Sequence, residues 1–264
     1  MKDENDLLIA KVLDKKKICN SKNKITYTDF LNVKEQCVIE KSIELKNAFF
    51  FGVNENADRK ILVFYPEKLT EELVRKSLKN VLAGIRITLK NEQIGVYEHK
   101  SYLAALIKIG IDRGKIGDIL VDDYGADIII FDINKEYIKQ SLSELTRFRK
   151  ADIEIISINE IKEKIDRFEE YTIIVSGMRI DNIVAELAGC SRASASEFIN
   201  SERVFVNYET VFKSSKNIFE GDIVTIRGKG KFRIDGLVRN TRNNRFVVKV
   251  SKYAWIQRVK IFWK

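Results

Sequence analysis

The sequence predicts a multidomain α+β protein, and three observations support this prediction. Apolar residues at helical spacing alternate with short strand-like runs along the 264 residues. A chain of this length can hold two or three domains of ordinary size. Its 45% apolar content is enough for hydrophobic cores, and its single proline, Pro66, leaves no obvious disordered linker.

Residues 1–68 are predicted to form a small N-terminal α/β unit. Apolar spacing indicates a helix over residues 3–17 and a second over about 28–46. Two β-rich runs, 48–53 and 60–65, flank a polar turn and predict a hairpin. The unit is so small that it could depend on the next domain for its core.

Residues 69–165 are predicted to form a central α+β domain. Helices are expected after Thr70, over 99–109 and over 134–149. Strands are expected at 85–89, 95–98, 119–121, 126–131 and 152–158. This order suggests helices on one face of a sheet and resembles ferredoxin-like RNA-binding folds. The charged stretch 161–170 connects this domain to the last one, with a boundary near Tyr171.

The excess positive charge of the chain lies in its last third. Residues 171–264 hold 17 Lys/Arg against 8 Asp/Glu, whereas residues 1–170 hold 30 of each. Residues 227–264 hold 12 Lys/Arg and one acid, Asp235, and apolar residues such as Phe232 and Ile234 alternate with these charges. Folded cationic strands next to a neutral body are typical of a polyanion-binding module.

Residues 171–240 are predicted to form this module, and residues 241–264 a basic, aromatic strand and tail. A helix is expected from Met178 to Leu187, and a second from Ser194, which has Glu197 at capping-box spacing. Strands are expected at 204–208 and 223–226. The tail aromatics could stack on bases or pack on the body: Trp255, Phe262 and Trp263.

Six spaced elements of the module resemble the small RNA-binding domain named after ribosomal protein S-four. They are Arg179-x-Asp181, Ser191-Arg192, Val204-x-Val206-Asn207, Lys213, Gly221-Asp222-x-Val224 and Arg227-Gly228-Lys229-Gly230. Two positions depart from the family pattern, because Glu202 and Tyr208 stand where that family has Gly. Both departures fall in turns.

The resemblance implies that two helices and a following loop form one basic face for structured RNA. Hydroxyls and helix N-terminal amides can donate to phosphate, and Arg can bind phosphate through two parallel hydrogen bonds. The candidate RNA-binding residues are Arg179, Ser191, Arg192, Ser194, Lys213, Arg227, Lys229, Lys231 and Arg233. Because exposed arginines rarely affect stability, replacing Arg179 and Arg192 by Ala is expected to weaken RNA binding without unfolding.

Several of these residues have alternative structural interpretations. Asp181 and Ser194 could cap helices, and Arg192 could pair with Glu186. The cations of residues 227–231 could belong to a solvated turn.

Residues 99–121 resemble the central block of the bacterial YlmH family, with Lys100 where Arg is usual and Ala104 where Gly is usual. This resemblance implies a cytoplasmic RNA-binding protein that acts on ribosomes. The implied partners are ribosomal RNA, tRNA and the large ribosomal subunit. The family is implicated in rescue of stalled large subunits carrying peptidyl-tRNA, within ribosome-associated quality control, and has also been linked to cell division.

Other function classes lack their residues in the sequence. Three distant cysteines and one histidine, His99, predict neither a metal site nor a catalytic centre, and we expect no cofactor. No apolar run predicts membrane insertion, and we expect a monomer. Two alternatives stay open: an RNA-modifying enzyme guided by the module, and a protein-interaction adaptor linked to cell division.

Overall fold

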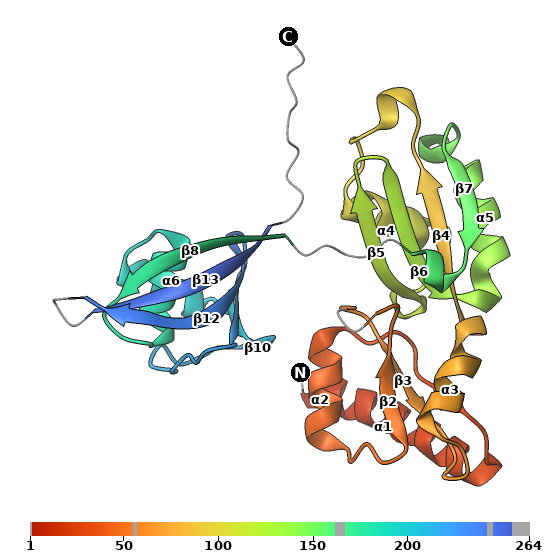
Figure 1. The fold of residues 1–264 in the computed structure, drawn as a ribbon, viewed down its shortest axis with the longest axis horizontal. Coiled ribbons are helices and arrows are strands. Elements are labelled where there is room, and N and C mark those ends of the chain that lie inside the picture. Colours follow the sequence, from red (N-terminus) through yellow and green to blue (C-terminus); the bar gives the residue numbers. More distant parts are fainter. Residues whose placement is uncertain (1, 55–56, 162–166, 242–244, 255–264) are drawn as a thin grey trace. The chain divides into compact units, whose positions relative to one another are not determined.

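The computed structural model describes residues 2–54, 57–161, 167–241 and 245–254 (Figure 1). The chain divides into two compact units, Met1–Lys164, called unit 1, and Ile165–Lys264, called unit 2. Helices and strands occur in both, and the predicted multidomain α+β class is confirmed. Among the described residues, no helix combines the length and the apolar character needed to cross a bilayer.

The first part of unit 1 is a small sheet, in the order β1-β3-β2, that packs against two helices. Its elements are α1 (Lys2–Lys22), β1 (Thr26–Tyr27), α2 (Val33–Ser42), β2 (Ala48–Phe51) and β3 (Ile61–Phe64). The expected hairpin is present because β2 pairs antiparallel with β3. Helix α2 begins later than expected, because Asn32, rather than a residue near 28, closes a capping box with Glu35.

The second part of unit 1 has the ferredoxin-like order of elements and a four-stranded antiparallel sheet, β5-β6-β4-β7. Its elements are α3 (Glu71–Ser77), β4 (Leu82–Thr88), α4 (His99–Lys108), β5 (Ile116–Asp122), β6 (Gly125–Phe131), α5 (Lys135–Glu144) and β7 (Asp152–Ile156). Tyr102 and Leu106 of α4 and Ile138 of α5 bury one face of this sheet. The expected strand at 95–98 is wrong, because Gly95 lies in a turn with φ of 71°.

The two parts of unit 1 share a hydrophobic core. Phe30 and Ile61 from the first part pack with Leu82, Ile129 and Phe131 from the second. The first part therefore covers one end of the sheet face that α4 and α5 leave bare. Residues 1–68 therefore depend on the next domain for part of their core, as their small size suggests.

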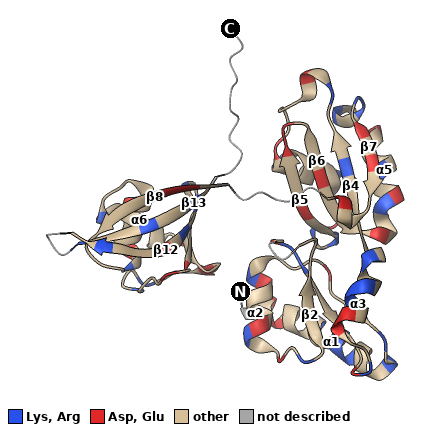
Figure 2. Ribbon diagram, in the orientation of Figure 1, with Lys and Arg blue, Asp and Glu red and all other residues tan. Residues whose placement is uncertain are grey.

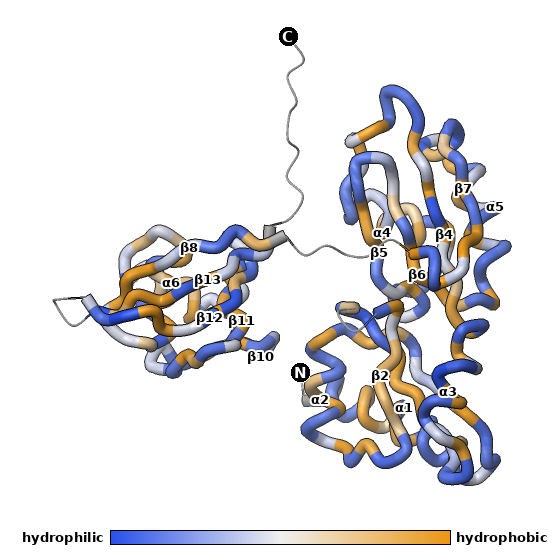
Figure 3. Tube along the Cα trace, in the orientation of Figure 1, coloured by the Kyte–Doolittle hydropathy of each residue, from blue (hydrophilic) through white to orange (hydrophobic). Residues whose placement is uncertain are grey.

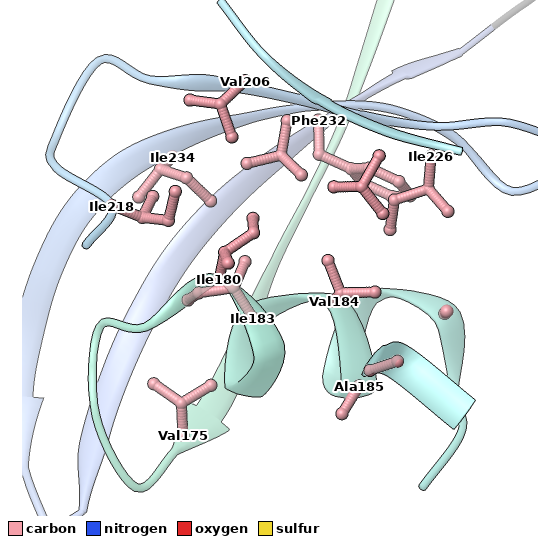
Figure 4. Packing of buried hydrophobic residues seen from close by; sticks show 14 of the residues in the cluster. Val175, Ile180, Ile183, Val184, Ala185, Val206, Ile218, Ile226, Phe232 and Ile234 are labelled. Atoms are coloured by element: carbon pink, nitrogen blue, oxygen red, sulfur yellow. The ribbon is translucent and has the colours of Figure 1, made fainter. Parts of the chain in front are cut away.

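Unit 2 is a six-stranded antiparallel sheet with two helices on one face. Its elements are β8 (Arg167–Val175), α6 (Ile180–Ala188), α7 (Arg192–Asn200), β9 (Val204–Val206), β10 (Glu209–Thr210), β11 (Ile223–Ile226), β12 (Gly230–Asn240) and β13 (Phe246–Ala254). The strand order is β10-β9-β11-β12-β13-β8. Ile180, Ile183 and Val184 of α6 pack against Phe232 and Ile234 of β12 (Figure 4). Figure 3 shows hydrophobic segments in β2 of unit 1 and in α6 of unit 2.

Strand β8 extends unit 2 beyond the predicted limits of the module. Tyr171 lies in the middle of β8 and pairs with Val250 of β13. Strand β13, which belongs to the predicted strand and tail 241–264, lies between β12 and β8 in the same sheet. The charged composition of 161–170 suggests a connector, but residues 167–170 are held by pairing with β13, a long-range contact that composition does not reveal. The tail residues Trp255, Phe262 and Trp263 lie outside the described residues.

Candidate nucleic-acid interface

Two exposed arginines on the helix side of unit 2 share one buried carboxylate. Nη2 of Arg179 lies 2.9 Å, and Nη2 of Arg192 2.8 Å, from Oδ2 of Asp181. The Asp181 side chain is 6% exposed, whereas those of Arg179 and Arg192 are 46% and 58% exposed. The carboxylate thus holds both guanidinium groups at the surface, where each keeps N–H donors for a phosphate.

Burial by itself raises the pKa of Asp181, but hydrogen bonds from Arg192 and Arg179 outweigh burial and hold the pKa below its ordinary value. The carboxylate is therefore ionised at neutral pH. The expectation that Asp181 caps α6 is wrong, because Arg179 occupies the N-cap position. Arg192 pairs with Asp181 rather than with Glu186, which lies 3.8 Å from Arg245.

The two candidate serines lie at the start of α7. Ser191 is the N-cap, and its Oγ accepts a hydrogen bond of 3.1 Å from the amide of Ser194. The expected helix start at Ser194 is therefore three residues late, because the Ser191 cap replaces the capping box that Ser194 and Glu197 suggest. The Oγ atoms of Ser191 and Ser194 are 3.1 Å apart. Both hydroxyls lie next to Arg192, at a helix end that favours anions.

Lys213 lies in a loop that is bound to the first turn of α6. The amide of Ile180 donates to the carbonyl of Lys216 at 2.8 Å, and the amide of Asp181 donates to that of Ser214 at 3.3 Å. Lys213 and Lys216 are exposed, and their loop lies against the first turn of α6. Lys216 was not among the residues predicted from the sequence. It could have been suspected because it follows the candidate Lys213 by three residues. We call Arg179, Ser191, Arg192, Ser194, Lys213 and Lys216 the helix face.

Lys231 and Arg233 lie on the opposite side of the sheet. They alternate along β12 with Phe232 and Ile234, which point into the core beneath α6 and α7. Since successive strand residues point to opposite faces, Lys231 and Arg233 point away from the helices. Lys231 and Arg233 therefore do not share the side on which α6 and α7 lie, and their proposed role in RNA binding stays a prediction.

The remaining candidates lie in the turn between β11 and β12. The guanidinium of Arg227 lies 5.0 Å from the ring centroid of Phe205, which itself alternates with the buried residues Val204 and Val206. Arg227 therefore belongs with Lys231 and Arg233 on the bare side of the sheet. Lys229 is exposed in the turn, where its amide donates to the carbonyl of Ile226.

The block 112–118 of unit 1 contributes structural contacts. The Asp118 carboxylate accepts hydrogen bonds from the amides of Asp58 and Arg59, at 3.0 and 3.1 Å. The Arg59 guanidinium donates to carbonyls of Phe30, Arg113 and Ile116. Burial is the main reason that the pKa of Arg59 falls to about 10. These contacts tie the first part of unit 1 to β5.

Comparison with known proteins identifies part of unit 1. Residues 75–162 match the family described as "Putative RNA-binding domain in YlmH". The resemblance to the YlmH family is confirmed. The matched residues include α4, β5, β6, α5 and β7, and so the YlmH domain is the ferredoxin-like part of unit 1. The S-four-like resemblance of residues 171–240 stays a prediction.

Two further proteins are similar to this chain. It is 26% identical over 251 residues to the ribosome-associated protein quality control protein P2 of Bacillus subtilis (strain 168), and the match covers 94% of each chain. A solved structure, the cell division protein ylmH from Streptococcus pneumoniae, aligns with a TM-score of 0.48 and 18% identity, covering 60% of this chain and 95% of that chain.

Among the described residues of the present chain, no group of three or more His, Cys, Asp or Glu could hold a metal ion.

Proposed function

We propose that this chain is a non-catalytic, cytoplasmic RNA-binding protein that acts on the ribosome. The proposed targets are large-subunit ribosomal RNA, tRNA or both, in the rescue of stalled large subunits. The proposal assigns structured RNA to the helix face of unit 2 and a supporting role to unit 1. It follows both the charge distribution of the chain and its similarity to the Bacillus protein, whose printed name describes ribosome-associated quality control.

The observation that carries the proposal is the pair of arginines held by Asp181. A guanidinium that is already oriented loses less freedom on binding a phosphate than a mobile one. The hydroxyls at the start of α7 and the lysines of the adjoining loop add donors around this pair. RNA helices are recognised mainly through their shape and backbone, and a compact group of oriented cations suits that mode of recognition.

The test must remove the cations without leaving a charged, buried carboxylate. Arg179→Ala with Arg192→Ala would take both neutralising groups away from the buried Asp181. Because an unpaired buried charge is destabilising, this variant is now expected to lose stability, contrary to the prediction from the sequence. A triple variant, Arg179→Gln, Asp181→Asn and Arg192→Gln, removes all three charges together. Its matched control is Arg86→Gln with Asp127→Asn, which removes an ion pair of 2.7 Å from unit 1.

Affinity for a duplex RNA hairpin is measured for the full chain as a function of salt. Neutralising about 5 phosphates gives a slope of log K against log salt of roughly −4 to −5. The triple variant is expected to make this slope shallower by about 2, one unit for each arginine lost, while the control retains it. An unchanged slope in a folded triple variant would exclude the helix face as the RNA site.

The ribosome part of the proposal has its own test. The tagged chain is sedimented with cell lysate through a gradient at low and high salt, and the co-purifying RNA is sequenced. Migration with large ribosomal subunits, with release at high salt, is expected. Migration at the top of the gradient without RNA at either salt would contradict a ribosomal role.

A further inference from the structure

The bare side of the unit 2 sheet carries one continuous row of side chains across five strands. Phe205 of β9 lies opposite Thr225 of β11, and Thr225 lies opposite Lys231 of β12. Tyr253 of β13 lies opposite Phe168 of β8, and the Lys231 ammonium lies 4.4 Å from the Tyr253 ring centroid. With strands about 4.8 Å apart, the row spans about 19 Å. We call these five residues, together with Tyr208, whose ring centroid lies 5.0 Å from the Lys231 ammonium, the sheet row.

Cations sit beside the rings of the sheet row. The Lys231 ammonium lies 5.0 Å from the ring centroid of Tyr208 and donates to its hydroxyl at 2.9 Å. The Arg233 guanidinium lies 4.9 Å from the ring of Phe168, and that ring meets Tyr253 edge-on at 4.9 Å. Each of the rings of Tyr208, Tyr253 and Phe168 therefore has a cation close to it.

Tyr208 holds its place at a conformational cost. Asn207 and Tyr208 connect β9 to β10, with φ of 49° and 67°. A two-residue hairpin with positive φ at both positions favours Gly at the second, because a side chain there costs about 1 kcal/mol or more. A bulky residue in a strained turn is a reason to look for a function, and here its ring extends the sheet row.

The charges of this side favour an anion. Its cations include Arg227, Lys231, Arg233, Lys249 and Arg239, which lies opposite Val247. Asp235 pairs with Arg233, and Glu170 pairs with Lys249. The Asp235 side chain is only 13% exposed, and it also accepts from Ser251. Lys231 and Arg227, which contact rings, are left to offset phosphate charge.

We propose that the sheet row binds a single-stranded RNA segment, with bases stacked on Phe168, Phe205, Tyr208 and Tyr253 and phosphates near Lys231 and Arg227. The proposal takes RNA as the ligand class from the proposed function and adds a second surface on the opposite side of the sheet. Proteins that bind single strands combine aromatic platforms with a cationic track. Ferredoxin-like RNA-binding sheets likewise stack two or three bases on their strands.

The chemistry of the sheet row separates a single strand from other occupants. Bases inside a duplex present no free face to a protein ring, whereas unpaired bases do. An acidic peptide would use Lys231 and Arg227 but would gain nothing from the rings. The observation that favours RNA is therefore that each ring of this surface has a cation beside it.

The decisive experiment compares Tyr208→Gly with Glu202→Gly in the full chain. Both residues have positive φ, 67° and 56°, and both are expected to tolerate Gly without loss of thermal stability. Affinity is measured for a labelled mixed-sequence single strand of about ten nucleotides. Tyr208→Gly is expected to lower that affinity by about five-fold or more, and Glu202→Gly is not expected to lower it.

Two ring variants repeat the comparison elsewhere in unit 2. Phe168→Leu and Tyr253→Leu each remove a ring from the sheet row, whereas Phe219→Leu removes an exposed ring that is outside it. The first two are expected to weaken single-strand binding about five-fold or more, and the third to leave it unchanged. Affinity of all three for a duplex hairpin is expected to stay at the level of the unchanged protein.

Several results would overturn the proposal. If the ring variants bind the single strand normally, the sheet row is not its site. If only the helix-face triple variant loses single-strand binding, all RNA binds on the helix side. If polyglutamate competes as well as RNA, the surface recognises charge alone. If deletion of residues 255–264 raises affinity while ring variants have no effect, the tail is the occupant. By contrast, loss of duplex binding in the triple variant together with loss of single-strand binding in the ring variants would support two separate surfaces.

Discussion

The two large sheets of this chain share an architecture and differ in the chemistry of their bare faces. Each has two helices packed on one face. In unit 1 the face away from α4 and α5 carries the row Leu120, Asp127, Arg86 and Glu154 across β5, β6, β4 and β7, and Asp127 is buried there. In unit 2 the bare face presents the sheet row. Figure 2 shows red bands on β5, β6 and β7 around a blue band on β4.

This difference shows that two sheets with a similar architecture can carry different surface chemistry. The unit 1 row has no aromatic member, and its one cation is committed to a carboxylate, since Arg86 forms two hydrogen bonds of 2.7 and 2.8 Å with Asp127. A phosphate backbone would meet Glu154 beside this pair. Residues 75–162 of unit 1 match the YlmH family, whereas most of the excess positive charge of the chain lies in unit 2.

The largest expected effect comes from the ion pair that distinguishes the unit 1 face. Asp127 is fully buried, and Arg86→Ala removes the guanidinium that neutralises it. Removing one partner of a buried pair costs about 3–5 kcal/mol. Chemical denaturation should show unit 1 destabilised by about that amount, with much of the loss restored in Arg86→Gln with Asp127→Asn. A loss below about 1 kcal/mol would mean that water screens this pair.

A smaller effect is expected at Asp181 of α6, a buried carboxylate of unit 2 that also pairs with arginine. Asp181→Asn weakens hydrogen bonds to two arginines, and we expect a loss of about 1–3 kcal/mol at neutral pH. Thermal melts that follow unit 2 at pH 7 would measure it. If the variant and the unchanged protein have the same melting temperature, the charge of Asp181 does not stabilise unit 2 through the two arginines.

The same residue predicts how the stability of unit 2 changes with pH. The folded pKa of Asp181 lies below that of the unfolded chain, about 3.9, and so its contribution is present above that pH. The contribution is lost as pH falls through the folded pKa. Melts between pH 7 and pH 2 should therefore fall more steeply below about pH 4 for the unchanged protein than for Asp181→Asn. Asp235 has a lowered pKa as well and stays in both proteins.

Adding a cation to the unit 1 row tests whether charge alone can reproduce the unit 2 face. Glu154→Lys places an ammonium beside Arg86 on an exposed strand position. An exposed charge contributes less than about 1 kcal/mol, and we expect single-strand RNA affinity to rise by less than five-fold at low salt. Binding titrations at two salt concentrations would show the gain vanish as salt rises. A larger, salt-resistant gain would mean that rings are unnecessary.

The smallest expected effect is at a strained turn. Glu202→Gly relieves a side chain with φ of 56°, and the greater freedom of Gly in the unfolded chain offsets part of the gain. We expect a net stabilisation of about 0.5 kcal/mol in chemical denaturation. Destabilisation would indicate that the Glu202 side chain makes contacts worth more than the strain.

Local patterns predicted much of the fold. Helix α4, the β2–β3 hairpin and the order of elements in the central domain follow from apolar spacing and turn residues. Element ends were less well predicted, because competing caps decide them: Ser191 and Ser194 both suit an N-cap, and only the observed start at Arg192 distinguishes them. Residues 167–170 look like a charged connector because their strand depends on pairing with β13.

The sequence by itself determined that the excess positive charge lies in the last third, and it predicted which residues contact RNA. It also located the two turn positions, Glu202 and Tyr208, where a side chain occupies a site that the S-four-like pattern gives to Gly. Only the tertiary structure separated the candidates of the helix face from those on the bare side of the sheet, since sidedness depends on strand register and on which face α6 and α7 cover. The tertiary structure also showed that Arg179 and Arg192 both pair with Asp181. The sequence does not reveal this, because only the fold decides which carboxylate is buried and must be paired.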